Sequence, residues 1–515
     1  MTHVARSTLI VAVFFGLEKL LGFLRQVLIA RTFGLSPELD AFNTANNLPD
    51  LIFALISGGA LAVAFIPVLS EYLEKRGRPQ AWELFSRIAN LVFLVTAGLS
   101  LVIALFADQL VRWQLGIAPG FGAQQQALVA ELMRLNLLAT LLFSLGGLAI
   151  AGLQANQHFL LPALAPSMYD LGTLFGVLVL APDKDLRLGS LHLPALNLGV
   201  HGLVYGVILG AALFLLVQVP GLLRYGFRWV PHIGLRHPGV LQVLSLLGPR
   251  LLTVLCIQLT FIAQDNIASR LAIGTVSALV YGWLFMQVPE TIIGTALGTA
   301  LLPTLSEQAA LEQTEAFRQS LNRALRALLT LTLPAAALIA AGIQPVVSLL
   351  GFDETGVELV TWTARAFLLG LMGHSLLEVS VRAFYARQDA LTPLLAAALT
   401  LLAFILLALT LGRSLGAPGI GLANALAFSG EALFLWALLS RRFRGMIQLG
   451  KTPWRALLAA IVSGLTTLLL LRLADSTLGG AGMLLQSASA VLAMGLGAAM
   501  TLPLIGNELK LLIRL

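Results

Sequence analysis

The sequence predicts an all-α polytopic membrane protein, because its composition is strongly apolar and its apolar segments have membrane-spanning length. Of its 515 residues, 58% are hydrophobic and only 11% are charged, which is more apolar surface than one soluble core could bury. A helix needs about 20 apolar residues to cross a bilayer. Charged residues, Pro and Gly separate about fourteen such segments, at 7–31, 40–70, 84–107, 126–153, 159–181, 199–223, 241–272, 277–307, 319–345, 355–384, 391–412, 417–440, 454–473 and 484–506.

The basic residues predict how these spans are oriented. Lys and Arg gather in alternate connections, at 75–78, 318–326 and 441–455, and are sparse in the others. This bias is typical of cytoplasmic loops, and it emerges only with an even number of spans. Both termini are therefore predicted to be cytoplasmic. Topology explains the net charge of +7, so nucleic acid is not expected as a partner.

Three blocks of sequence recur in the same order, which indicates two homologous halves. Leu-Pro-Asp at 48–50 is echoed by Val-Pro-Glu at 288–290, Ile-Pro at 66–67 by Leu-Pro at 302–303, and Gln157 by Gln388. Each half would hold six spans and enter the membrane in the same orientation, as in parallel-repeat transporters. The predicted division is an N-lobe at 1–223, a C-lobe at 224–440, and a C-terminal helix pair at 441–515.

The first span carries charges that need partners or water. Glu18, Gly22 and Arg25 share one helical stripe, and Lys19 lies about 100° away. Each charge costs on the order of 3 kcal/mol at the centre of an isolated membrane helix. Two interpretations stay open, namely interhelical ion pairs that fix packing and the charged wall of a hydrated cavity. The cavity interpretation is favoured because the two cations, Lys19 and Arg25, cannot both pair with the single anion Glu18.

Further ionisable residues lie in the second half. Arg250 and Arg382 are candidate substrate-binding cations, although Glu378 and Arg382 could form an i, i+4 structural pair. Asp265, between two amides, is a candidate site for Na⁺ or H⁺, because coupling ions are held by carboxylate and carbonyl oxygens. A buried, hydrogen-bonded carboxylate is the alternative interpretation of Asp265.

Two prolines are candidate hinges, and the sequence carries no enzyme signature. Pro49 and Pro289 occupy equivalent positions in the two halves, and such prolines interrupt the hydrogen-bond ladder of a helix. The histidines are scattered, Cys256 is the lone cysteine, and no paired metal-ligand spacing occurs. A transporter without a cofactor is expected, with no metal site other than a possible Na⁺ at Asp265.

Several motifs resemble those of the MurJ (MviN) family, which are lipid II flippases of the multidrug/oligosaccharidyl-lipid/polysaccharide exporter superfamily. The resemblance covers the whole chain and rests on Leu-Gly-Phe-Leu-Arg at 21–25, Ala-Arg-Thr-Phe-Gly at 30–34, Asp-Ala-Phe at 40–42, Leu-Pro at 48–49, Ala-Phe-Ile-Pro at 64–67, Leu-Gly-Thr-Ala-Leu-Leu-Pro at 297–303, Phe-Tyr-Ala-Arg-Gln-Asp at 384–389 and Thr-Pro at 392–393.

The resemblance implies a bacterial inner-membrane transporter with two lobes in a V shape. A cationic cavity would hold the diphosphate and head group of lipid II, and a groove beside the last two helices would hold the polyprenyl tail. Alternating access would be driven by Na⁺, H⁺ or the membrane potential. Asp40 joins the candidate substrate residues and Asp389 the candidate coupling residues. Membrane lipids and the cell-wall synthesis machinery are the implied partners.

The sequence departs from the family pattern in the cavity. Arginines expected in the second and eighth spans are replaced by Phe53 or Ala54 and within 282–285, and an expected acidic residue is Gly58. Arg25 and the charge of Lys19 remain. A flippase for another polyprenyl-(pyro)phosphate-linked saccharide, an ion-coupled multidrug-type exporter and a transport-inactive scaffold are therefore alternatives. The exporter would need an acidic cavity for cationic drugs.

Overall fold

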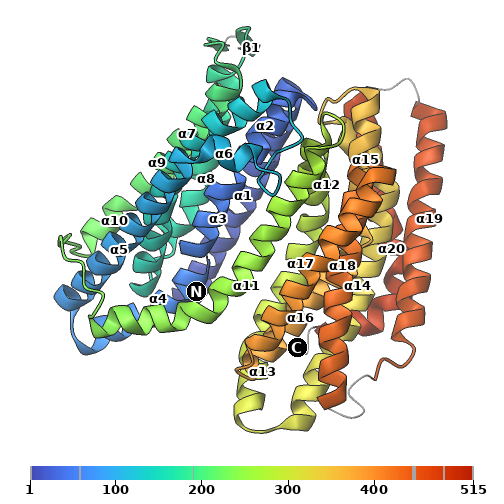
Figure 1. Ribbon diagram of the computed structural model, residues 1–515. Coiled ribbons are helices and arrows are strands. Elements are labelled where there is room, and N and C mark those ends of the chain that lie inside the picture. The colour runs from blue at the N-terminus through green and yellow to red at the C-terminus, as the bar shows by residue number, and fades with distance from the viewer. Residues whose placement is uncertain (1–2, 57–58, 189–190, 443–447, 479–481, 513–515) are drawn as a thin grey trace. The chain divides into compact units, whose positions relative to one another are not determined.

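The structure is a computed structural model that describes residues 3–56, 59–188, 191–442, 448–478 and 482–512. The chain forms two compact units, Met1–Asn266 and Ile267–Leu515. We call them the N-terminal unit and the C-terminal unit (Figure 1). Within the described residues both units are helical apart from one short hairpin, which confirms the predicted all-α class.

The N-terminal unit contains the helices α1 to α10 and nearly all of α11. Its elements are α1 His3–Phe33, α2 Pro37–Ala45, α3 Asn47–Ile56, α4 Gly59–Lys75, α5 Arg78–Leu105, α6 Ala107–Arg112, α7 Ala123–Ala155, α8 Leu160–Phe175, the π-helical turn η1 Gly176–Leu180, β1 Leu186–Leu188, β2 Leu191–Leu193, α9 Gly199–Leu216, α10 Val219–Arg224 and α11 Pro238–Ala268. The two strands pair antiparallel, with Arg187 opposite His192. This hairpin lies in the connection between the predicted spans 159–181 and 199–223.

The C-terminal unit continues with helices α12 to α20. Its elements are α12 Thr275–Glu290, the π-helical turn η2 Thr291–Thr295, α13 Ala296–Ala310, α14 Thr314–Ser348, α15 Glu354–Leu368, α16 Leu371–Ala386, α17 Leu391–Leu415, α18 Ala417–Arg442, α19 Thr452–Leu478 and α20 Met483–Leu512. The last two helices, α19 and α20, pack against each other and against α14 (Figure 1).

The structure supports many membrane spans, while the predicted number of fourteen remains a prediction. Among the described residues, 11 helices are long and apolar enough to cross a membrane, or up to 12 if α15 and α16, bent by 41°, count as one span. The two expected spans beyond these correspond to α1 and to the series α2, α3 and α4. The side chains in the first part of α1 lie outside the described part of the chain, and the second expected span is interrupted at Asn46, between α2 and α3.

The turns that end equivalent helices confirm the internal repeat. Gln157 follows α7 with φ 56°, and Gln388 follows α16 with φ 60°. This left-handed conformation is uncommon for a residue with a side chain. The Gln157 N–H donates to Gln154 O at 2.9 Å, and the Gln388 N–H donates to Tyr385 O at 2.9 Å. The third sequence echo is therefore a shared helix-terminating turn.

Two more pairs of left-handed residues occupy equivalent connections. Gly34, between α1 and α2, has φ 61°, and Gly274, between α11 and α12, has φ 84°. Gly77, before α5, has φ 83°, and Glu312, before α14, has φ 55°. Gly34 and Gly274 have the same separation in sequence as Pro49 and Pro289. The duplication thus includes backbone conformation as well as residue type.

The segment between α10 and α11 runs along α5 and is fixed to it by a row of hydrogen bonds. The indole Nε1 of Trp82 donates to Tyr225 O at 3.0 Å. The Val230 N–H donates to Ser86 Oγ at 3.2 Å, and Asn90 Nδ2 donates to Val230 O at 2.9 Å. The three α5 residues are spaced by four and therefore share one face of the helix. The connection to α11 consequently belongs to the N-terminal unit.

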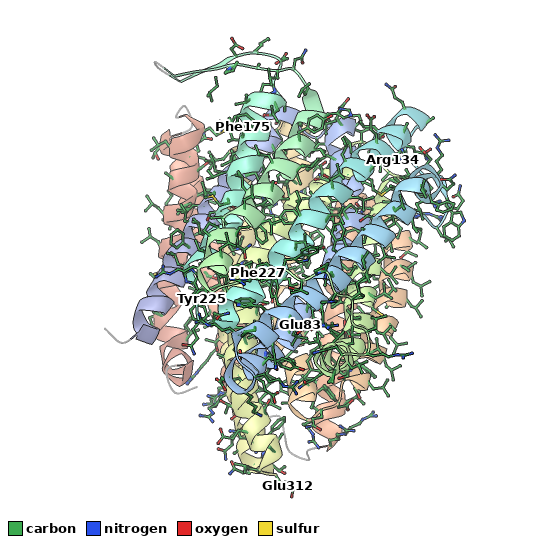
Figure 2. All side chains as sticks on the ribbon, turned by 90° about the vertical axis from the view of Figure 1, so that its left-hand side faces the viewer. Glu83, Arg134, Phe175, Tyr225, Phe227 and Glu312 are labelled. Carbon is green, nitrogen blue, oxygen red and sulfur yellow. The ribbon has the colours of Figure 1, made fainter. Side chains whose placement is uncertain are left out.

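Aromatic packing reinforces this attachment. The Phe227 ring lies edge-on against Trp82 and Phe85, with centroids 5.5 and 5.1 Å apart. Figure 2 shows Phe227 and Tyr225 near Glu83, which belongs to α5. The start of α11 then joins the apolar core of α4, α5 and α7. Compactness therefore places the first unit's end at Asn266, beyond the predicted limit at 223, while the division into functional lobes at 223 and 440 stays a prediction.

Candidate functional site

Arg25, the cation predicted to line a cavity, forms an ion pair with a residue of another helix. Helix α1 packs along α8, and Arg25 Nη1 donates to Asp170 Oδ1 at 2.7 Å. Only 17% of the Arg25 side chain and 3% of the Asp170 side chain are exposed. The guanidinium also lies over the Tyr169 ring, 4.9 Å from its centroid. Asp170 is the partner that the sequence reasoning missed.

The neighbouring residues of α1 complete a balanced charge group. Lys19 Nζ lies 3.3 Å from Glu18 Oε2. Gly22 lies beside the ion pair, where an added Cβ atom would make ordinary contact with Asp170 Oδ2 at 3.8 Å. With Asp170 included, two cations lie beside two anions, so the expected shortage of anions on α1 is made up by a residue of α8.

A signal for Asp170 was present in the sequence. It is the one ionisable side chain between 159 and 181, apart from Tyr169. An isolated carboxylate in an apolar membrane segment calls for a cationic partner. The sequence did not indicate which helix would supply that partner, because 145 positions separate the two residues.

Asp40 lies in the first turn of α2 and is buried, with 1% of its surface exposed. Ser36 is the N-cap of this helix, and its Oγ accepts a hydrogen bond from the Leu39 N–H at 3.2 Å. A carboxylate in the first turn of a helix is favoured by the helix dipole. The structure thus gives Asp40 a local helical environment, and its contact with substrate stays a prediction.

Asp265 of α11 lies beside the break between α2 and α3, and 7% of its surface is exposed. Asn47 Nδ2 donates to Asp265 Oδ2 at 2.7 Å and to Thr44 O at 3.1 Å. Asn136 Nδ2 of α7 donates to Asn46 Oδ1 at 2.8 Å. Carboxylate, amide and backbone oxygens therefore gather at this break. They are the oxygen types that hold hard cations, and the coupling role of Asp265 remains a prediction.

The amide that follows Asp265 has a different partner. Asn266 Nδ2 donates to Gly116 O at 2.6 Å and to Gln114 O at 3.0 Å. These carbonyls belong to the connection between α6 and α7. Asn266 thus secures the end of α11 to the N-terminal unit. The amide that reaches Asp265 is Asn47, which lies 218 positions away in sequence.

In the C-terminal unit, Arg382 forms the predicted i, i+4 ion pair with Glu378 on α16. Arg382 Nη2 also donates to Thr299 Oγ1 of α13 at 3.3 Å. Gly298 allows this approach, because a Cβ atom there would lie 2.9 Å from Arg382 Nη1. Arg382 is thus held between α16 and α13, and its role in substrate binding stays a prediction.

The hinge candidates lie beside irregular backbone. Pro289 is inside α12, and the π-helical turn η2 follows directly after Glu290. Thr295 Oγ1 at the end of η2 donates to Glu290 Oε1 at 3.1 Å. Pro49 lies in the first turn of α3, just after the chain bends away from α2. Prolines and π-turns are common causes of helix bending, and the hinge role stays a prediction.

Arg250 and Asp389 are the two remaining candidate residues. Arg250 is in α11, but its side chain lies outside the described part of the chain. Asp389 precedes α17, where its carboxylate accepts hydrogen bonds from Thr392 N at 3.0 Å and Thr392 Oγ1 at 2.9 Å. Arg442 Nη1 lies 3.3 Å from it. These are the contacts of a helix cap, and the coupling role of Asp389 stays a prediction.

The surroundings of Asp389 set its ionisation. Partial burial acts to raise its pKa, but the hydrogen bonds from Thr392 and the nearby Arg442 guanidinium outweigh burial and lower the pKa below 3.8.

The described residues contain no group of three or more His, Cys, Asp and Glu side chains that could hold a metal ion.

Many helices of membrane-spanning length and apolarity, with a buried ion pair between two helices, define a multi-pass membrane protein. The profile of the family described as "Lipid II flippase MurJ" matches residues 29–487. The chain belongs to this family of inner-membrane transporters, which confirms the resemblance found in the sequence motifs.

Individual relatives agree with this assignment. A lipid II flippase MurJ of Burkholderia cenocepacia is 33% identical over 400 residues, 75% of this chain and 74% of the relative. A probable lipid II flippase MurJ of Rhizobium meliloti is 30% identical over 463 residues, 87% of this chain and 83% of the relative.

Solved structures share the fold. A lipid II flippase MurJ in an inward closed conformation has a TM-score of 0.76 at 21% identity, covering 96% of this chain and 99% of that one. An inward-facing multidrug resistance MATE transporter of the MOP superfamily has a TM-score of 0.68 at 14% identity, covering 83% and 95%. At these identities the likeness concerns the fold alone.

Proposed function

We propose that this chain is a lipid II flippase, which moves the lipid-linked peptidoglycan precursor from the inner to the outer leaflet of the cytoplasmic membrane by alternating access. The observation that carries the proposal is the family match across residues 29–487. The relatives named lipid II flippase MurJ cover about three quarters or more of the chain. Lipid II and the surrounding membrane lipids are then its partners, with the cell-wall synthesis machinery as a further one.

The Arg25–Asp170 pair suggests how the head group is recognised. A diphosphate needs charge-assisted donors in a low-dielectric cavity, and a guanidinium offers a planar fork for phosphate oxygens. Asp170 neutralises Arg25 in the structure, so an arriving phosphate would replace the carboxylate as the partner. Such an exchange keeps the cation compensated throughout. Lys19, Glu18, Asp40, Arg250 and Arg382 are the further proposed substrate residues.

The departures from the family pattern alter the surroundings of this pair. Phe53 stands where an arginine was expected, and its ring lies 5.9 Å from that of Phe143. Phe143 in turn packs edge-on against Tyr169, with centroids 5.2 Å apart. An aromatic group thus reaches from α3 to the ring beneath Arg25. A different polyprenyl-linked saccharide remains the alternative substrate. Aromatic side chains pack against the apolar faces of sugar rings, but they do not neutralise the charge of a diphosphate as the expected arginines would.

Transport is proposed to be driven by Na⁺ or H⁺ at Asp265, with Asp389 as a second candidate, or by the membrane potential. The hydrogen bond from Asn47 to Asp265 supports the first site, because it joins α3 to the end of α11. Binding or loss of a cation there would act on both helices. Pro49 and Pro289 are the proposed hinges, and both termini are proposed to be cytoplasmic.

Complementation of a bacterial strain depleted of its lipid II flippase tests the function. The wild-type chain should restore growth, and Arg25→Ala should abolish rescue. Lys75→Ala is the matched control, since Lys75 pairs with Glu71 on an exposed surface of α4. Loss of rescue by Arg25→Ala alone, at equal membrane abundance, supports the proposal. A wild-type chain that reaches the membrane and fails to rescue would favour another saccharide lipid.

A further inference from the structure

The C-terminal unit has a pocket that none of the proposed transport residues lines. It has a volume of about 690 Å³ and lies between α14, α15 and the junction of α17 with α18. A second pocket of about 450 Å³ adjoins it. Glu358, Trp362 and Arg365 line both. This stripe of α15 therefore faces two connected spaces, and Figure 1 shows α15 among its neighbouring helices.

The larger pocket has an apolar wall. Leu369, Leu415 and Leu422 line it, and Leu369 and Leu415 are 72% and 53% exposed. Leu369 and Leu422 lie within the predicted spans 355–384 and 417–440, and Leu415 is the last residue of the candidate span Leu391–Leu415, so their exposed surfaces would meet acyl chains rather than water. The pocket consequently continues from a polar stripe into a surface suited to a hydrocarbon chain.

Arg365 is a cation that lines this pocket, and none of the described carboxylates forms an ion pair with it. Its Nε donates to Ala340 O at 2.9 Å, and its guanidinium lies over the Trp362 ring, 4.9 Å from the centroid. Within the described part of the chain, no carboxylate pairs with Arg365 and its terminal amino groups make no hydrogen bond. A half-buried guanidinium of this kind requires an anion or water.

Glu358 supplies a negative charge on the same stripe. Glu358, Trp362 and Arg365 follow the i, i+4, i+7 spacing of one helix face. Glu358 and Arg365 are about 10 Å apart along the axis, and the Arg365 side chain leans toward the helix N-terminus, where Glu358 lies. The pocket thus presents a cation, an aromatic face and an anion in sequence, without an ion pair that cancels them.

We propose that this pocket binds a membrane phospholipid with a phosphoethanolamine head group. Arg365 holds the phosphate, Glu358 accepts hydrogen bonds from the ammonium group, and one acyl chain lies along Leu369, Leu415 and Leu422. Trp362 lies between the two charges, as amphipathic aromatic side chains do at membrane interfaces. The assignment does not depend on the transported substrate.

The two charges select among head groups. An anionic phosphoglycerol head satisfies Arg365 but leaves Glu358 without a cation and places a net negative charge near it. A phosphocholine head carries a positive charge, but its quaternary nitrogen has no N–H to donate. Of these three head groups, phosphoethanolamine alone gives both side chains a charge-assisted hydrogen bond.

Native mass spectrometry of the full-length protein, in detergent with phosphatidylethanolamine, phosphatidylglycerol or phosphatidylcholine of equal chain length, tests this assignment. The wild-type protein should retain phosphatidylethanolamine about tenfold better than the other two, as one charge-assisted hydrogen bond predicts. Equal retention of the three lipids would overturn the proposal.

Two variants locate the site. Arg365→Gln should lose the retention of all three lipids. Glu358→Gln should retain phosphatidylglycerol and phosphatidylethanolamine equally, because only the ammonium contact is removed. Arg413→Gln and Glu312→Gln, exposed residues that do not line the pocket, are the controls. Glu358 is exposed, so its variant decides the matter even if Arg365→Gln does not fold. An unchanged lipid preference in Glu358→Gln would contradict the assignment.

Discussion

Arg25 on α1 and Asp170 on α8 form an ion pair, with 2.7 Å between Nη1 and Oδ1, and the carboxylate is almost fully buried. The pair converts a cation inside a membrane helix into a neutral unit. It also places the proposed diphosphate-binding group next to a competing anion. The strength of this pair therefore bears both on folding and on substrate affinity.

Removing one partner should destabilise the protein more than removing both. Asp170→Asn leaves a buried guanidinium without its anion, which costs about 3 kcal/mol for pairs of this kind. The double variant Arg25→Gln with Asp170→Asn should lose less stability than Asp170→Asn alone, because no buried charge is then left without a partner. Thermal unfolding of the four proteins in one detergent measures this difference. Additive losses would show that the two side chains do not interact.

Gly22 should tolerate a methyl group but not a long side chain. An added Cβ atom would make ordinary contact with Asp170 Oδ2, at 3.8 Å, whereas Gly22→Leu would push α8 away and cost about 2 kcal/mol. Gly16→Leu is the control, because a Cβ atom there meets no other atom within 4 Å. Equal stability of Gly22→Leu and Gly16→Leu would refute the close approach. The thermal midpoint of each variant provides the comparison.

Asp265→Asn should weaken the ion dependence of transport, because an amide cannot bind a cation or release a proton as a carboxylate can. Initial transport rates in proteoliposomes, with and without a Na⁺ or H⁺ gradient, measure this dependence. Asn266→Ala is the control, since Asn266 binds the connection between α6 and α7. If Asp265→Asn responds to both gradients like the wild type, Asp265 does not bind the coupling ion.

Asp389 should stabilise the start of α17 at neutral pH and lose that effect in acid. Its pKa is lowered in the folded protein, so its contribution is present above the ordinary value of 3.8 and disappears as pH falls through the lowered value. Asp389→Ala should cost about 1 kcal/mol at pH 7, as lost helix caps do. The difference in thermal midpoint between wild type and variant should shrink from pH 7 to pH 3. If the difference in thermal midpoint is the same at pH 7 and pH 3, the charged form of Asp389 is not the cause of the stabilisation.

The sequence was sufficient for the fold class and the duplication, because apolar length and recurring turn residues are local properties. Gln157 and Gln388 lie in echoed motifs, and they adopt the same left-handed turn. The cap at Asp389 is likewise local, since Thr392 follows three residues later. The spacing of Asp389 and Thr392 is itself an indication of capping in the sequence.

The partners of the buried charges could not be predicted in the same way. Arg25 finds Asp170 145 positions away, and Asp265 finds Asn47 218 positions away. Such pairs depend on which helices pack together and in which rotation. Apolar periodicity does not specify either, because many helix faces are equally apolar. The break at Asn46, between α2 and α3, was also not predicted, because the sequence marked only Pro49, three residues later, as a candidate hinge.

The appearance of lipid II in the outer leaflet tests the central claim most directly. Proteoliposomes containing labelled lipid II, with the purified chain reconstituted, can be treated with a hydrolase that cleaves the head group and cannot cross the membrane. The account predicts that the wild-type chain makes inner-leaflet lipid II accessible to the hydrolase, and that Arg25→Ala leaves it protected. Protection equal to protein-free vesicles with the folded wild-type chain, under Na⁺, H⁺ and potential gradients alike, would contradict the account.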